Sequence, residues 1–441
     1  MTSDQQLWGE ETAKAVENFQ ISGETVPVSV IHWLARIKGA AAAVNGELGL
    51  LSKRTASRIE RAAGEIAAGR YDDQFPIDVF QTGSGTSTNM NANEVIARLA
   101  GVGVHPNDDV NMGQSSNDVF PSAVHLAALD VAQHELLPAL KQLERAFVKK
   151  SRSFQNVVKA GRTHLMDAVP VTLGQEFAGY AAQMALASER VSAALVHVGQ
   201  IPLGGTATGT GLNTHRRFAE KVRARLKRRS GLKQIAAPLD PFEAQANRDA
   251  LVELSGALKV VAVSLTKIAG DLALMGSGPR AGIGELFLPE LQKGSSIMPG
   301  KVNPVIPEVV LQVSAQVIGN DTAITIGGMQ GQFELNVRIP LIARNLLQSL
   351  HLLSAATRAL AEKCVDGIQV NRAGTEASAG GTLAVATALN GAIGYDRASV
   401  IVKKATASGR PLREVALEEG VDAKLYDETI DLRRIARGNQ A

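Results

Sequence analysis

The feature that most constrains the fold is a long apolar seam near the middle of the chain. Between residues 251 and 275, apolar side chains recur at alternating spacings of three and four residues, which is typical of a long helix packed nearly parallel to its neighbours. At ~1.5 Å per residue, this seam is roughly 36 Å long. The seam consists of Leu251, Leu254, Leu258, Val261, Leu265, Ile268, Leu272 and Met275.

Three further segments carry similar stripes, from Leu126 to Phe147, from Phe177 to Leu195 and from Ile342 to Leu360. Long stripes with few polar interruptions predict a helical bundle. Such helices expose more apolar surface than one thin bundle can cover, so we expect the chain to self-associate. A larger monomeric bundle is the alternative interpretation.

We therefore predict an all-α fold of three domains. Aromatic residues make up only 4% of the chain, while Ala, Leu and Val are common, which also favours helix. The predicted domains are an N-terminal helical domain at 1–114, a central long-helix bundle at 115–370 and a small C-terminal helical domain at 371–441. Within the first, helices are expected at Val28–Gly49 and Leu51–Ala68.

Composition narrows the function classes. The single cysteine, Cys364, excludes an intrachain disulfide and fits a reducing compartment. The polar start MTSDQQLWGEET argues against a signal peptide, and no apolar run is long enough to span a bilayer. The net charge of +3 is spread along the chain without aromatic–basic interleaving. We expect a cytoplasmic protein with neither nucleic acid nor membrane as a partner.

Four polar, glycine-rich segments interrupt the helical pattern. They are QTGSGTSTNMN at 81–91, HPNDDVNMGQSSND at 105–118, GRTHLMD at 161–167 and the run from Gly276 to Pro304. Loops longer than about 12–15 residues in a compact domain are usually functional or disordered. The last segment is not poor in apolar residues, so disorder is the less favoured interpretation.

Several kinds of site are absent from the sequence. No G-x-G-x-x-G is completed, no Gly-Lys-Ser/Thr occurs, no Cys/His cluster has metal-ligand spacing and no G-x-S-x-G elbow is present. The four segments share small hydroxyl and amide side chains with few cations, chiefly Lys301. These groups make directed hydrogen bonds to carboxylate oxygens, which would suit a small polycarboxylate. Alternatively, they simply occupy turns and helix caps.

Two histidines in these segments are candidate functional residues. His164 follows Arg162-Thr163 and precedes a strong helical pattern, and it could act as an acid or base near neutral pH. A helix-capping or core histidine is the alternative. His105 precedes Pro106 and is either a turn residue or a ligand-binding residue.

Together these segments resemble the aspartase/fumarase superfamily, most closely the class II fumarate hydratases. GSSIMPGKVNP, at 294–304, is similar to the signature of that superfamily. The resemblance covers nearly the whole chain, from Leu7-Trp8-Gly9 to Ile393-Gly394-Tyr395. Similar segments in the same order are TGSGTSTNMNANEV, HPNDDVNMGQSSND, GRTHLMDAVPVTLGQEF, PLGGTATGTGLNTH and QGQFELNV.

The resemblance implies reversible anti addition of water to fumarate, giving L-malate as in the tricarboxylic acid cycle, without metal or organic cofactor. It implies that Ser295 is the base for the carbon-bound proton, stabilised by loop N–H groups and Lys301. His164, paired with Glu308, would act on the water side. It also implies a homotetramer in which three subunits build each site. The implied substrate-carboxylate binders are Ser84, Thr86, Ser115, Ser116, Asn117, Thr163, Ser296, Lys301 and Asn303.

Some positions depart from the family pattern. His105, Asn107 and Asp108 resemble a secondary dicarboxylate site, but Val102 stands where that site often has an arginine. Arg338 occupies a position that is often aromatic or apolar, and few residues precede Leu7-Trp8-Gly9.

Two alternatives to a fumarate hydratase belong to the same fold. An aspartate ammonia-lyase usually has Gln after GRT and Gly-Ala-Gly in the first loop, where this chain has His164 and Gly83-Ser84-Gly85. The second alternative is a non-catalytic homologue. The intact Ser295, Lys301 and Glu308 argue against it.

Overall fold

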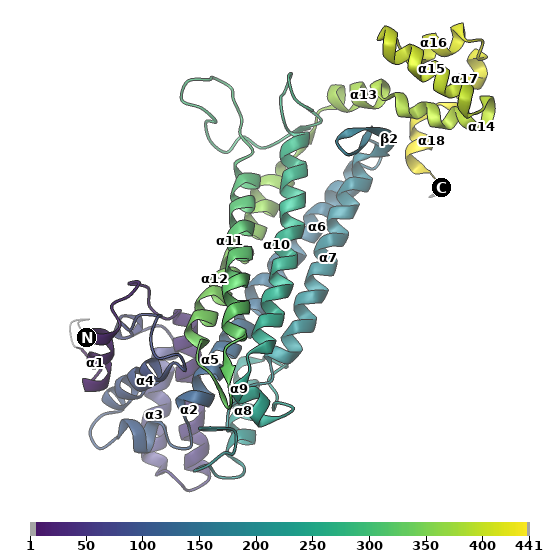
Figure 1. Cartoon of the computed structure of the whole chain (residues 1–441). Helices are drawn as coiled ribbons and strands as arrows, with labels where there is room; N and C mark the ends of the chain where they lie inside the picture. Colours follow the sequence, from purple (N-terminus) through teal and green to yellow (C-terminus); the bar gives the residue numbers. More distant parts are fainter. Residues whose placement is uncertain (1–5, 439–441) are drawn as a thin grey trace. The chain divides into compact units, whose positions relative to one another are not determined.

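The computed structural model describes residues 6–438, which form helices joined by loops and three short two-stranded antiparallel sheets (Figure 1). The predicted all-α class is confirmed. The chain divides into two compact units. The first contains the chain up to Pro138 together with Ala187–Ala262 and Val313–Ala355, and the second contains Ala139–Leu186, Val263–Gln312 and the chain from Ala356 onward. The division into three domains stays a prediction.

The first unit holds the helices of the N-terminal part. The helices expected at 28–49 and 51–68 are confirmed, and each begins and ends within two residues of the expected bounds. Pro27 precedes the first of them, and Ser52 begins the second by accepting a hydrogen bond from Thr55 N–H. The elements are α1 (Glu10–Asn18), α2 (Val28–Glu47), α3 (Lys53–Ala67), η1 (Asp72–Gln74), α4 (Thr86–Ala100), η2 (Pro106–Val110), α5 (Ser116–Val131), η3 (Ala132–Leu136), α8 (Phe218–Ser230), α9 (Pro241–Ala246), β4 (Gly331–Gln332) and β5 (Leu335–Asn336).

Four long helices contribute residues to both units. The predicted seam lies on one of them, α10, where every seam position is buried and Met275 is the most exposed at 5%. In the first unit α10, α11 and α12 are joined by buried polar contacts: Ser255 Oγ donates to Asp321 Oδ1 at 2.7 Å, and Asn320 Nδ2 donates to Ser349 Oγ at 3.0 Å. The long helices are α7 (Leu173–Val198), α10 (Asp249–Met275), α11 (Val305–Gly328) and α12 (Ile339–Ala359).

The stripe predicted from Leu126 to Phe147 is also confirmed as helical and buried. Here α5 continues through the π-helical turn η3 into α6 (Leu137–Ser153).

The second unit ends in short helices, as expected for the helical segment at 371–441. A small core around Leu389, Ile401 and Ala416 holds them together. None of the helices in residues 6–438 has the length and apolarity needed to cross a membrane. The remaining elements are β3 (Leu286–Phe287), η4 (Leu360–Cys364), η5 (Val365–Gly367), β6 (Gln369–Val370), α13 (Arg372–Gly381), η6 (Leu383–Leu389), α14 (Asn390–Ile393), α15 (Tyr395–Ser408), α16 (Leu412–Glu418), α17 (Ala423–Thr429) and α18 (Leu432–Arg437).

GRTHLMD does not form the loop expected before α7. It forms the end of a β-hairpin, in which β1 (Val158–Thr163) pairs with β2 (Met166–Thr172). The β-branched residues Val158, Thr163, Val171 and Thr172 favour this extended pairing. The interpretation of this segment as a loop was therefore wrong, because its few polar residues surround a two-residue turn rather than a long connection.

Candidate active site

In the first unit, five of the predicted carboxylate binders lie at the beginnings of two helices. We call Ser84, Thr86, Ser115, Ser116 and Asn117 the hydroxyl cluster. Ser84 Oγ lies 2.8 Å from Thr86 Oγ1, which lies 2.8 Å from Ser116 Oγ. Thr86 and Ser116 are the first residues of α4 and α5, whose first-turn N–H groups lack helical partners. The cluster can therefore bind an anion with hydroxyl and backbone donors.

The buried carboxylate of Asp118 fixes the geometry at the beginning of α5. Asp118 Oδ1 accepts from Ser115 N–H at 2.8 Å, and Ser115 Oγ accepts from Asn117 N–H at 3.2 Å. Asp118 Oδ2 accepts from Gly204 N–H at 2.8 Å. Burial raises the pKa of Asp118 to about 6, against the lowering effect of its backbone N–H donors. A second hydrogen bond joins the beginning of α5 to the 204–207 loop, since Asn117 Nδ2 donates to the Ala207 carbonyl at 2.9 Å.

In the second unit, Thr163 and His164 lie at the tip of the hairpin and are exposed. His164 and Leu165 have φ angles of 58° and 60°, in the left-handed region that a two-residue type I′ turn requires at both central positions. This conformation is unfavourable for a leucine and persists only where the surroundings impose it. The turn presents the imidazole of His164 outward. Within residues 6–438, this ring makes no hydrogen bond or ion pair.

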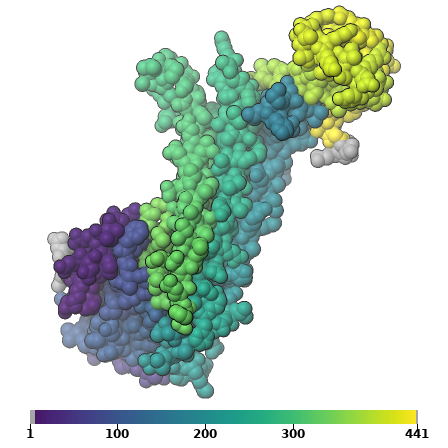
Figure 2. Space-filling model, in the orientation of Figure 1, coloured from purple at the N-terminus to yellow at the C-terminus, as the bar shows by residue number. Residues whose placement is uncertain are grey.

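Ser295, Ser296, Lys301 and Asn303 lie in one loop, Gly294–Asn303, which we call the lid segment. In Figure 2 the chain between α10 and α11 projects from the ends of these helices. The lid segment closes on itself, since Gly294 N–H donates to the Lys301 carbonyl at 3.0 Å and Asn303 Nδ2 donates to the Gly294 carbonyl at 2.9 Å. A Cβ at Gly294 would lie 2.1 Å from the Lys301 carbonyl oxygen, so only glycine fits there.

Inside the lid segment, Ser295 Oγ accepts hydrogen bonds from two backbone N–H groups. Ile297 N–H donates at 3.2 Å and Met298 N–H at 3.0 Å. Ser295 is half-buried, whereas Ser296 and Lys301 are exposed. Among the described residues, the Lys301 ammonium has no hydrogen-bond or ion-pair partner. Ser295 thus already has the donors that would stabilise negative charge on its oxygen.

Glu308 lies in the first turn of α11, four residues after Pro304, and is exposed. No hydrogen bond joins its carboxylate to His164 in the described part of the chain. The predicted pair of His164 and Glu308 is therefore not formed within residues 6–438.

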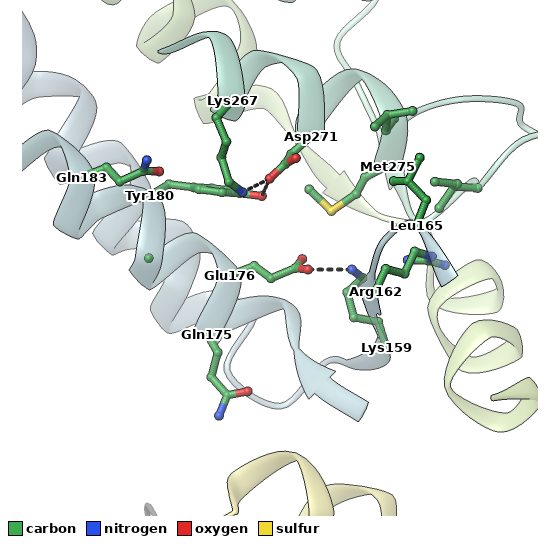
Figure 3. A pocket seen from close by; sticks show the side chains of 13 residues that line it. Lys159, Arg162, Leu165, Gln175, Glu176, Tyr180, Gln183, Lys267, Asp271 and Met275 are labelled. Carbon is green, nitrogen blue, oxygen red and sulfur yellow. Dashed lines mark hydrogen bonds and ion pairs between the residues drawn. The ribbon is translucent and has the colours of Figure 1, made fainter. Parts of the chain in front are cut away.

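A buried charged network anchors the hairpin in the second unit, beside a cavity of about 470 Å³ (Figure 3). The fully buried Glu285 accepts from Arg162 Nη1 at 2.9 Å and lies 3.1 Å from Lys159 Nζ. Lys159 also donates to Glu176 of α7 at 2.8 Å. Further along the cavity, Tyr180 Oη donates to Asp271 at 2.8 Å. The network connects β1, α7 and the chain between α10 and α11, and so positions the segments that carry His164 and Ser295.

The residues of the predicted secondary site lie together at the exposed turn η2. His105 Nδ1 accepts from Asp108 N–H at 3.1 Å and lies 3.2 Å from Asp108 Oδ2. Val102, at the position of the missing arginine, is 98% exposed. Its carbonyl accepts from Arg58 Nη2 at 2.9 Å, so an arginine from α3 reaches this loop.

The sequence interpretation missed two buried carboxylates that hold the segments of the predicted site, Asp118 and Glu285. Asp118 could have been found, because Ser-x-x-Asp before an apolar run is a capping signal. Glu285 carries no such signal, since its role depends on burial. No cluster of three or more His, Cys, Asp or Glu side chains suited to a metal ion occurs in residues 6–438.

Comparison with known proteins adds family information to this geometry. A family model described as "Lyase" matches residues 2–319, and one described as "Fumarase C C-terminus" matches residues 385–437. The class II fumarate hydratase of Corynebacterium efficiens is 54% identical over 434 residues, which cover 97% of this chain and 92% of the relative. That of Mycobacterium tuberculosis is 53% identical over 431 residues, which cover 97% and 91%.

Solved structures are similar over the same extent. The class II fumarase from Schistosoma mansoni superposes with a TM-score of 0.95 at 37% identity, covering 98% of this chain and 96% of that chain. A cobalt-bound fumarate lyase:delta crystallin from Brucella melitensis gives a TM-score of 0.94 at 45% identity, covering 99% and 97%.

Proposed function

This chain belongs to the class II fumarate hydratase family of lyases, and we propose on that ground that it catalyses the reversible anti addition of water to fumarate, giving L-malate. The observation that carries the proposal is an identity of 54% to a class II fumarate hydratase over 97% of the chain. The predicted family is confirmed by these relatives, and they do not favour the aspartate ammonia-lyase alternative.

The chemical difficulty is the proton on the carbon beside a carboxylate. Removing it from malate builds a doubly negative aci-carboxylate, so hydrogen-bond donors must already face that charge. We assign the proton to Ser295, whose Oγ accepts from the N–H groups of Ile297 and Met298. These donors favour the alkoxide over the hydroxyl. The ammonium of Lys301, in the same lid segment, adds positive charge when the segment closes over substrate.

His164 serves the oxygen side of the reaction. In hydration it removes a proton from water as the hydroxyl adds to one carbon, and Ser295 delivers its proton to the other carbon from the opposite face. In dehydration both transfers run backward. The exposed turn at His164 and Leu165 presents the ring for this role. Glu308 is assigned to orient the ring and raise its basicity in the assembled enzyme.

The hydroxyl cluster binds one substrate carboxylate, together with Thr163, Ser296 and Asn303. The proposed binders and catalytic groups come from both units. We propose a homotetramer. In support, α11 buries Val310, Val317 and Ile324 on one face yet exposes further apolar side chains on others. These exposed residues are Val309 at 43%, Ile318 at 39% and Ile326 at 55%.

Two finer assignments belong to the same proposal. His105, Asn107 and Asp108 form a secondary dicarboxylate site, with Arg58 near the place of the missing arginine. The location is cytoplasmic, which agrees with the single, buried cysteine Cys364.

The test is the fall in fumarate's ultraviolet absorbance after purified protein is added in ammonia-free buffer. A Ser295→Ala preparation at equal concentration controls for contaminating hydratase. If fumarate is consumed only when ammonium is present, the activity is addition of ammonia and not of water. No consumption under either condition would refute both activities.

A further inference from the structure

A buried lysine contacts residues 111–114, the segment immediately before Ser115 of the hydroxyl cluster. Lys38 of α2 is 0% exposed, and α2 contacts both α5 and η2 in the first unit. Its ammonium donates to Asn111 Oδ1 at 3.1 Å and to Gln114 Oε1 at 3.4 Å. Among the described residues no carboxylate lies within 4 Å of it. A buried ammonium held only by neutral oxygens is costly, so its retention needs a reason.

Lys38 orients two side-chain amides, and at Asn111 it does so together with Asn89, whose Nδ2 donates to the same Oδ1 at 3.3 Å. Because both amide oxygens face the ammonium, both NH₂ groups face backbone carbonyls. Asn111 Nδ2 donates to the Gln114 carbonyl at 3.1 Å, and Gln114 Nε2 donates to the Val110 carbonyl at 3.0 Å. Asn45, seven residues after Lys38 on the same face of α2, donates to the Met112 carbonyl at 3.0 Å. The turn at 110–114 is thus tied to α2 immediately before Ser115.

Asp118 holds the same segment through hydrogen bonds from the backbone. Its carboxylate binds the N–H groups of Ser115 and Gly204, so the N-terminus of α5 is fixed between α2 and the 204–207 loop. Burial lowers the pKa of Lys38 to about 7, and the negative charge of Asp118 opposes that shift. The two buried groups therefore interact electrostatically across the segment that carries Ser115, Ser116 and Asn117.

We propose that Lys38 is a positioning residue for substrate binding: by orienting Asn111 and Gln114 it holds Ser115, Ser116 and Asn117 where their donors meet a dicarboxylate. Asp118 holds the same segment through the N–H group of Ser115. The inference rests on the proposed function, because it takes the hydroxyl cluster as the place where a substrate carboxylate binds. Lys38 itself does not touch the substrate.

Lys38→Met tests this assignment, since methionine keeps the unbranched shape and removes the charge and the donors. We expect the KM for fumarate to rise about tenfold or more, while kcat changes by less than about threefold, because misplaced donors weaken binding and leave Ser295 and His164 intact. The matched control is Arg36→Met, which removes a positive charge from the exposed side of the same helix and should leave KM unchanged. A purely structural role would lower the yield of active enzyme without changing KM.

Gln114→Met is the second variant, because it removes one acceptor of Lys38 and keeps a side chain of similar size at this half-buried position. It should also raise the KM for fumarate, by a smaller factor than Lys38→Met. If Lys38→Met does not fold, the KM of Gln114→Met alone tests the positioning role. A KM within about twofold of wild type in the folded variants would overturn the proposal, as would a loss confined to kcat.

The proposed function is judged separately, by the activity of the unmodified protein. If that protein does not hydrate fumarate, the same variants are compared by calorimetric titration with succinate, a non-reacting dicarboxylate. Weaker succinate binding by the variants than by wild type would then support the positioning role, and equal affinity, or no binding even by wild type, would overturn it.

Discussion

Arg162 Nη1 lies 2.9 Å from the fully buried carboxylate of Glu285. Arg162 is two residues before His164 on β1, and Glu285 is ten residues before Ser295 in the chain between α10 and α11. One ion pair thus joins the two segments that carry the proposed acid–base groups. Lys159 strengthens the connection at 3.1 Å, and Ser378 Oγ donates to the same carboxylate at 2.8 Å.

Replacing Glu285 by glutamine should therefore impair both stability and turnover. The change leaves Lys159 and Arg162 beside a neutral side chain, and breaking a buried pair in this way typically costs about 3–5 kcal/mol. We expect a lower midpoint of thermal unfolding together with a lower kcat. Glu290→Gln, an exposed position in the same connection, is the control and should change neither quantity. Wild-type behaviour of Glu285→Gln would show that the network does not position the hairpin.

His164→Asn should lower kcat by ~10²–10⁴, the usual contribution of a general acid–base. Asparagine tolerates the left-handed conformation of the turn, so the hairpin should persist. Steady-state kinetics of fumarate hydration measures the change. His134→Asn, an exposed histidine paired with Asp130, is the matched control and should retain full activity. A His164 variant within about twofold of wild type would remove this residue from the mechanism.

Ser295→Ala should reduce kcat at least as much as His164→Asn, because within residues 6–438 no other side chain accepts from the N–H groups of Ile297 and Met298. Size-exclusion chromatography should show the same assembly as wild type, since Ser295 lies in a loop outside the helical core. Ser296→Ala is the neighbouring comparison. That variant should raise KM and leave kcat nearly unchanged, because Ser296 is proposed to bind substrate only. If Ser295→Ala and Ser296→Ala lowered kcat equally, Ser295 would not have the distinct role of the base.

The pH dependence of stability should carry a contribution from His125 on α5. Burial and, to a smaller extent, the charge of Arg248 lower its pKa from 6.5 to about 3, against the opposing effect of a hydrogen bond to the Val198 carbonyl. Between these two values the unfolded chain binds a proton that the folded chain does not, so stability is lost as pH falls below about 6.5. In wild type, the unfolding midpoint should drop between about pH 7.5 and about pH 5.

His125→Gln should show a smaller drop over the same interval, because glutamine can still donate to the Val198 carbonyl but does not titrate. His197→Gln, an exposed histidine paired with Glu253, is the control and should leave the drop close to that of wild type. An unchanged pH dependence in His125→Gln would assign the acid sensitivity to other groups.

The sequence by itself determined the helical core and the residues proposed for the site. The seam on α10 could be predicted residue by residue, because burial of one helix face requires apolar side chains at spacings of three and four residues, and these spacings are visible in the sequence. The hydroxyl residues could be predicted too, since they form local patterns at helix beginnings. Family resemblance then assigned roles to Ser295 and His164 that no spacing could have supplied.

Only the tertiary structure decided how these residues are held. Thr86 and Ser116 are separated by 30 positions in the chain, yet their hydroxyls lie 2.8 Å apart. GRTHLMD became a hairpin turn because β1 and β2 pair across it, and the polarity of the seven residues does not reveal that pairing. Lys38 and Glu285 look like ordinary surface charges in the sequence. Their importance arises from burial, which removes water and leaves each charge dependent on the few partners that the fold brings to it.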